Sequence, residues 1–89
     1  MAVGLKGLKT KLTKRFPHVW LKDGHEFSSE YDKTLWTGEG SDIDGIPAFD
    51  HYNYEFYVMG VHPKLEEFLT KLGYYCEWHD GGTVFIYKM

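Results

Sequence analysis

The side chains best suited to catalysis in this 89-residue chain are one cysteine and a few serines. Cys76 falls in an alternating stretch, on the side shared with apolar residues, where a thiol normally packs and stays unreactive. Ser28, Ser29 and Ser41 lack the strand-turn-helix context that exposes a hydrolase serine. No glycine-rich phosphate loop occurs. We therefore identify no catalytic residue, expect no cofactor, and favour a non-enzymatic protein.

A metal site is the next chemistry to consider, because the chain has five histidines and the segment Asp42-Ile43-Asp44-Gly45. Aligning Gly45 with the glycine of a calcium-binding loop leaves Gly40 and His51 at end positions that need acids. No pair of histidines has the His-x-x-x-His spacing, and none clusters with the cysteine as zinc ligands do. Glu77 and His79 share a strand face, which favours a surface pair. We expect no metal ion, and a metal protein or an uncharacterised enzyme stays open as a third alternative.

Charged residues are sorted by position along the chain. Residues 1–22 contain six basic side chains and no acid, whereas residues 23–57 contain nine acids against Lys33 alone. Residues 58–89 are nearly balanced, so the net charge of −3 hides two opposed fields. Such segregation either closes on itself in the fold or presents a charged face to a partner.

The two charged stretches favour different partners. Lysines neutralise phosphates, and Tyr75, Phe85 and Tyr87 can add stacking platforms for nucleic acid. The isoelectric point of about 5.9 nevertheless lies below the range usual for such domains. In the acidic stretch, carboxylates alternate with rings that can anchor a contact steered by charge. We therefore predict binding to another protein, with nucleic acid as the alternative.

The predicted partner-binding residues combine acids with aromatic rings. They are Asp42, Asp44, Asp50, Trp36, Tyr52, Tyr54, Tyr75, Phe85 and Tyr87. One alternative stays open, namely that the basic N-terminal stretch neutralises part of the acidic one within the fold.

Length and composition are those of a single folded domain. The apolar fraction is 43 %, the aromatic fraction is 18 %, and only three residues are prolines. A single cysteine forms no intrachain disulfide, which indicates a reducing compartment. No apolar run approaches the roughly 18 residues of a membrane span. We expect a cytoplasmic protein that does not enter a membrane.

Two helices are predicted from apolar residues at three- and four-residue spacing. The first carries Leu5, Leu8, Leu12 and Phe16, and Pro17 ends it. As an isolated peptide it resembles a membrane-surface helix, but we expect its leucines to dock on a sheet.

The second helix has the clearer boundaries. His62 can cap it, Pro63 suits its first position, and Gly73 suits a left-handed exit. Glu67 precedes Lys71 by the four residues that favour a surface ion pair. Its apolar stripe consists of Leu65, Phe68, Leu69 and Leu72.

Short alternating or β-branched runs predict five strands. They are 18–22, 33–37, 55–59, 74–79 and 83–88, with residues 40–54 as a loop and residues 23–32 unassigned. The last two strands form a hairpin around Asp80-Gly81-Gly82, for which a three-residue loop with a glycine bulge fits best. The fold class is α+β, with two helices packed on one face of a small antiparallel sheet in the order α-β-β-β-α-β-β.

The hairpin register decides which side chains share a face. It places Cys76, Trp78, Val84 and Ile86 on one face. It places Tyr75, Glu77, His79, Thr83, Phe85 and Tyr87 on the other. That second face is either exposed to solvent or covered by the acidic segment.

About half of the chain resembles small bacteriophage-encoded proteins of unassigned function. The resemblance lies in the stretch from residue 60 through residue 83, with residues 45–50 before it, and it is one of style, without a defined motif. It implies a viral accessory role in the host cytoplasm, often by binding a host protein, as an inhibitor would. It carries no catalytic residue over to this chain.

Overall fold

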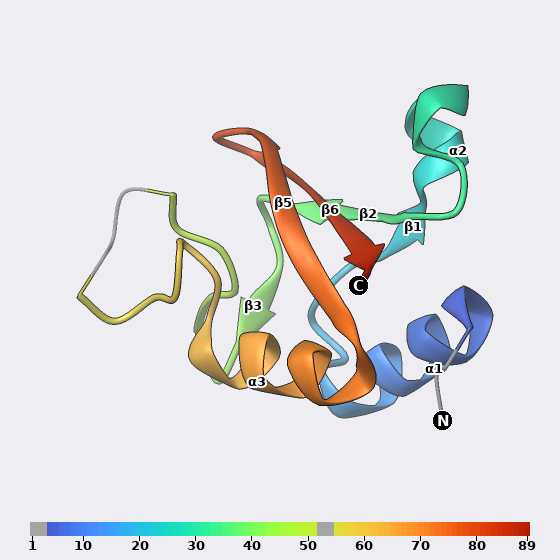
Figure 1. Cartoon of the computed structure of the whole chain (residues 1–89). Coiled ribbons are helices and arrows are strands. Elements are labelled where there is room, and N and C mark those ends of the chain that lie inside the picture. The colour runs from blue at the N-terminus through green and yellow to red at the C-terminus, as the bar shows by residue number, and fades with distance from the viewer. Residues whose placement is uncertain (1–3, 52–54) are drawn as a thin grey trace.

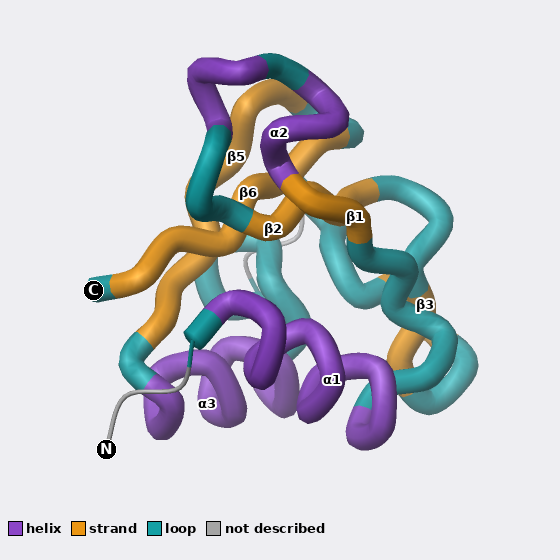
Figure 2. Tube along the Cα trace, turned by 90° about the vertical axis from the view of Figure 1, so that its right-hand side faces the viewer, coloured by secondary structure: helices purple, strands orange, loops and turns teal. Residues whose placement is uncertain are grey.

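The structure is a computed structural model that describes residues 4–51 and 55–89 (Figure 1). Its α+β class is the predicted one. Helices α1 (Leu5–Arg15) and α3 (Pro63–Leu72) lie together on one face of an antiparallel sheet. The short helix α2 (Gly24–Phe27) and the 3-10 turn η1 (Ser29–Tyr31) lie over the opposite face (Figure 2). The sheet is therefore the middle of three layers.

The main sheet has four strands in the order β1-β2-β6-β5. Their bounds are Lys22–Asp23 for β1, Leu35–Gly38 for β2, Tyr74–Asp80 for β5 and Thr83–Lys88 for β6. All neighbours are antiparallel. A separate small hairpin consists of β3 (Asp42–Ile43) and β4 (Ile46–Pro47).

The β5–β6 hairpin has the two predicted faces, and Tyr74 and residues of β2 extend them. The inner face, toward α1 and α3, consists of Leu35, Thr37, Tyr74, Cys76, Trp78, Val84 and Ile86. The outer face consists of Trp36, Tyr75, Glu77, His79, Thr83, Phe85 and Tyr87. Cys76 pairs with Ile86 and Trp78 with Val84, which is the predicted register.

Helix α1 docks through its leucines, as expected. Leu8 and Leu12 have no exposed surface, and Phe16 meets Phe68 of α3 edge to face at 5.5 Å between ring centroids. The helix ends at Arg15 because Phe16 leaves helical geometry and Pro17 cannot continue it. The lysines of α1 surround this anchored face.

Helix α3 has the predicted boundaries. The Nδ1 atom of buried His62 accepts a hydrogen bond from the Lys64 amide at 3.1 Å. Pro63 occupies the first turn, and Gly73 leaves the helix at φ 84°. On the exposed side, Lys71 pairs with Glu67 at 3.2 Å.

The predicted strand at 18–22 is wrong except for Lys22. The Trp20 amide donates to Ser41 Oγ at 3.2 Å, and the His18 carbonyl accepts from the Asp42 amide at 3.0 Å. These bonds satisfy the segment against the β3 region instead of against the sheet. The apolar residue Val19 is buried, although the segment around it is not a strand.

The predictions between residues 40 and 59 also need correction. The expected loop contains the β3–β4 hairpin, whose turn has positive φ at Asp44 (53°) and Gly45 (82°). The expected strand at 55–59 is wrong: Val58 forms only an isolated bridge to Val61. Met59 and Gly60 form the turn between Val58 and Val61, with φ of 52° and 82°. Both turns have the two left-handed residues of a type I′ hairpin.

The tip of the β5–β6 hairpin differs in detail from the prediction. Asp80 pairs with Thr83, which leaves Gly81 and Gly82 as a two-residue turn. The register shift lies between Trp78 and Asp80, so the bulge is in β5 and not at a glycine. The predicted side-chain faces survive because the bulge restores the parity that a two-residue turn would reverse.

No helix in the described ranges is both long enough and apolar enough to span a bilayer.

The docking of α1 gives a stability prediction. We expect Leu12→Ala to lower the free energy of unfolding by about 2–5 kcal/mol, because it leaves a cavity under α1. Lys11→Ala, at the neighbouring exposed position, should change it by less than about 0.5 kcal/mol. Chemical denaturation of both variants measures the difference. Equal effects would contradict the docked orientation of α1.

His62 gives a prediction about pH. Burial lowers the pKa of His62 from its ordinary value near 6.5, with the nearby Lys64 charge acting in the same direction and Asp44 against it. The folded state therefore resists protonation, and its stability should fall as pH drops below about 6.5. His62→Asn keeps an oxygen that can cap α3 but does not titrate.

Thermal unfolding between pH 7.5 and about 5 checks this expectation. The His62→Asn variant should lose less stability across that range than the wild-type chain. His25→Asn, a substitution of an exposed histidine, should keep the wild-type slope. An unchanged slope in His62→Asn would show that His62 does not carry the effect.

Candidate protein-binding surface

Aromatic rings from α2 and η1 cover part of the outer face of the sheet. Tyr31 stacks on Phe85 with the ring planes 2° apart and the centroids 4.0 Å apart. Phe27 meets Phe85 and Trp36 edge to face, at 5.2 and 5.1 Å. His79 lies against the same rings. Phe85 is consequently only 1 % exposed, so this predicted contact residue supports the others from beneath.

Local contacts fix the α2–η1 segment in this position. The Asp23 amide donates to Glu26 Oε2 at 3.1 Å, which closes the first turn of α2. The Gly24 amide donates to the Thr34 carbonyl at 2.9 Å. A Cβ atom at Gly24 would lie 2.0 Å from Thr34 Oγ1, so only glycine fits there. The segment is therefore held directly against the start of β2.

The remaining part of the outer face is a pair of half-buried tyrosines. Tyr75 and Tyr87 lie nearly parallel, with centroids 5.6 Å apart. Burial raises the pKa of Tyr87 above its usual value, and the neighbouring Glu77, Tyr31 and Tyr75 raise it further. Exposed carboxylates on the same elements or beside them are Asp23, Glu26, Glu30, Asp32 and Glu77.

Trp20 connects this aromatic face to an acidic pocket. Its ring meets Trp36 edge to face at 5.6 Å, and its indole N–H donates to the Glu39 carbonyl at 2.8 Å. Glu39, Asp42 and Asp50 line a cavity of about 270 Å³. The other lining residues are Gly40, Ser41, Pro47, Phe49, His51 and Gly81.

Backbone hydrogen bonds place the carboxylates of this acidic pocket. The Asp42 amide donates to the His18 carbonyl, and the Asp50 amide donates to the Gly60 carbonyl at 2.8 Å. Between them, the Ala48 amide donates to the Ser41 carbonyl at 2.8 Å. Residues 41–50 are therefore folded back on themselves, which brings Asp42 and Asp50 to the same cavity although eight positions separate them.

Asp44, the third predicted acid, lies apart from that pocket. It forms an ion pair with Lys64 of α3. The hydrogen bond from Lys64 is the main cause that lowers the pKa of Asp44, and the Lys64 charge adds to it. Asp44 therefore connects the β3–β4 turn to helix α3. Tyr52 and Tyr54, the other predicted contact residues, lie outside the described residues.

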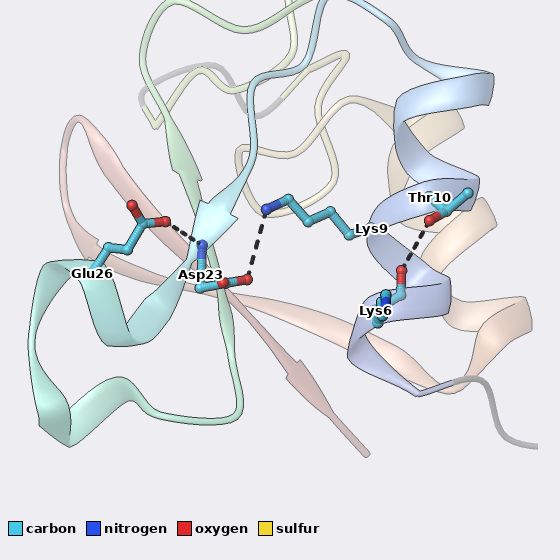
Figure 3. Close-up of polar contacts among 5 residues, drawn as sticks. All are labelled: Lys6, Lys9, Thr10, Asp23 and Glu26. Carbon is cyan, nitrogen blue, oxygen red and sulfur yellow. Dashed lines mark hydrogen bonds and ion pairs between the residues drawn. The ribbon is translucent and has the colours of Figure 1, made fainter.

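The basic and acidic stretches are only slightly neutralised by each other. Among the described residues, one ion pair joins them, between Lys9 Nζ and Asp23 Oδ1 at 3.7 Å (Figure 3). Lys22 adds a cation–π contact, 5.3 Å from the centroid of Trp36. Exposed Lys6, Lys11 and Lys14 form no ion pair within those ranges. The lysines of α1 and the acids of α2 and η1 thus stay on opposite layers, whereas Asp42 and Asp44 line a cavity together with Arg15.

Some residues of this surface were predicted from the sequence, and others were not. Trp36, Tyr75 and Tyr87 share the outer face, and Asp42 and Asp50 share the pocket. The missed members are Trp20, Phe27, Tyr31 and Glu39. Phe27 and Tyr31 stand four residues apart, a spacing that could have indicated one covering face in the unassigned segment.

Two features bear on the other chemistries considered. Burial raises the pKa of the Cys76 thiol well above its usual range, and Glu66 raises it further, so the thiol stays protonated at neutral pH. Within residues 4–51 and 55–89, no group of three or more histidine, cysteine or acidic side chains is placed to hold a metal ion.

The covering role of Tyr31 leads to a prediction. Tyr31→Ala should expose Phe85 and lower the free energy of unfolding by about 1–3 kcal/mol, because a stacked ring is lost from a half-buried site. Tyr31→Phe keeps the ring and should change stability by less than about 0.5 kcal/mol. Denaturation curves and near-ultraviolet circular dichroism measure the two variants. Equal loss in both would show that the hydroxyl, and not the stacking, holds η1 in place.

No protein-family model, curated protein or solved structure matches the chain.

Proposed function

We propose that the chain is a non-enzymatic module that binds another protein through an acidic-aromatic surface. This surface comprises the outer-face rings of Trp36, Tyr75 and Tyr87 and the acidic pocket of Glu39, Asp42 and Asp50. The covering rings of Phe27 and Tyr31 belong to it as well. The partner presents basic side chains.

The observation that carries the proposal is the shared pocket of Asp42 and Asp50. Three carboxylates around a cavity of about 270 Å³ can receive the head of a lysine or arginine. Trp20 links the pocket to the aromatic face, because it contacts Trp36 and bonds to the Glu39 carbonyl. Half-buried rings of this kind commonly anchor protein interfaces. The carboxylates would supply steering and register, while the rings would supply most of the contact energy.

The resemblance to small phage-encoded proteins suggests where such a partner belongs. We infer a host protein of the bacterial cytoplasm, with inhibition or modulation of that protein as the outcome. The acidic surface would then occupy a basic groove of the host protein. This part of the proposal depends on the resemblance and not on the geometry.

The geometry gives less support to nucleic-acid binding. Helix α1 packs on the inner face of the sheet, whereas Tyr75 and Tyr87 lie on the outer face. A nucleic acid would have to pass around the sheet to contact both the lysines and the rings. Contact with the lysines of α1 alone would be sequence-independent and strongly dependent on salt.

The proposal predicts the effect of neutralising the pocket. In affinity capture from bacterial lysate, the Asp42→Asn/Asp50→Asn variant should retain about a tenth of the wild-type partner, from two charge contacts of roughly 0.5–1 kcal/mol each. Asp44→Asn is the matched control, since Asp44 pairs with Lys64 away from the pocket. It should capture the partner as the wild type does.

Two outcomes would contradict this proposal. Persistence of every captured partner on the pocket variant would remove the acidic pocket from the interface. Loss of capture on nuclease treatment or at moderate salt, without dependence on Asp42 and Asp50, would favour nucleic acid.

A further inference from the structure

We propose a second binding site at the free edge of β5, for an extended protein segment in which basic and apolar residues alternate. It goes beyond the function proposed above, because it uses main-chain pairing at a different place on the molecule. β5 is the last strand of the order β1-β2-β6-β5. In Figure 1 it crosses the front of the molecule, and no helix or strand is drawn in front of it.

This edge lacks the features that usually block strand addition. Natural edge strands are protected by lysine, proline, a bulge or a covering segment. The stretch Tyr74–Trp78 contains neither lysine nor proline, and the bulge comes after it, between Trp78 and Asp80. Within the described part of the chain, no other strand pairs with β5 on this side. The opposite edge, β1, is only two residues long.

A groove of about 570 Å³ runs along this edge. It is lined by Met59, Val61, Glu66, Tyr75, Cys76, Glu77 and Trp78. Its wall is fixed, because the Trp78 indole N–H donates to the Met59 carbonyl at 2.9 Å. Met59 itself is 78 % exposed and presents an apolar side chain beside the strand.

The charges of the groove identify its occupant. Its two charged lining residues are both acids, Glu66 from α3 on the inner side and Glu77 on the outer side. Side chains of an added strand alternate between the two faces. Because the residues of the segment alternate, its basic side chains share one face: on the outer face they would meet Glu77, and its apolar side chains on the inner face would meet Trp78. Main-chain bonds would supply affinity, as in other strand additions.

A second copy of this chain fits the edge less well. Pairing β5 with β5 would bring Glu66 and Glu77 of each copy to a single seam. Like charges across neighbouring strands are destabilising. The edge therefore favours a basic segment from another protein.

A display library of random decapeptides tests the site. Selection on the wild-type chain should enrich alternating sequences with lysine or arginine, and the amide resonances shifted by a selected synthetic peptide should centre on residues 74–78. N-methylation of alternate peptide amides that face β5 should abolish binding. Methylation of the intervening amides should leave it intact, because those groups point away from the edge.

A matched pair of variants, one in β5 and one in α3, tests the charge argument. Glu77→Gln should weaken the selected peptide by about 2–5-fold, as expected for an exposed ion pair. Glu67→Gln should have no effect, because Glu67 pairs with Lys71 outside the groove.

Three results would overturn the site. The first is a selection that enriches no sequences, or only acidic or helix-patterned ones. The second is equal tolerance of both N-methylation patterns. The third is a dimer in sedimentation whose formation shifts the amide resonances of β5. None of these depends on Asp42 or Asp50, so the site and the proposed function stand or fall separately.

Discussion

The structure depends on β6 being apolar on both faces. Val84 and Ile86 point to the inner face with no exposed surface, and Phe85 points to the outer face with 1 % exposed. A strand of this kind has to lie inside the sheet and be covered on both sides. The leucine stripes of α1 and α3 cover one side, which makes the helical layer necessary. Phe85 then requires a second cover, and α2 with η1 supplies it.

The three-layer arrangement explains why the charge segregation of the sequence persists in space. The basic stretch forms α1 in the helical layer, while the first acidic residues pass through β1 into the α2–η1 layer. The sheet separates these two groups, which meet at Lys9 and Asp23, whereas Asp44 lies on the helical side near Arg15 and Lys64. Ion pairs this exposed contribute little to stability. The segregated charge is therefore a property of the outer surfaces and not a device that holds the fold together.

Local signals predicted the parts of the fold that local physics determines. α3 needed only a cap, a proline and a glycine, and the hairpin faces needed only strand parity. The predictions of strands at 18–22 and 55–59 failed because the actual partners cannot be read from the local pattern. Residues 18 and 20 bond to Asp42 and Ser41, which are far along the chain, and Val58 bridges to Val61, only three residues away. The pocket was only half predicted. Asp42 and Asp50 were chosen for charge, but the bonds that fold residues 41–50 back have no sequence pattern.

The same constraint on β6 sets where the molecule can bind. β6 and β2 are central strands, and Phe27 and Tyr31 cover part of their outer face. Of their outer-face rings, Trp36 and Tyr87 are half-buried and Phe85 is buried. β5, by contrast, is covered on its inner face but has an open edge, and Glu77 with Tyr75 lies at the border between face and edge. Side-chain contacts on the outer face and main-chain contacts on the β5 edge would therefore both involve Tyr75 and Glu77. A basic segment that pairs with β5 could continue onto the outer face and place its next side chains against Tyr87, so one partner chain can engage both regions without any rearrangement of the core.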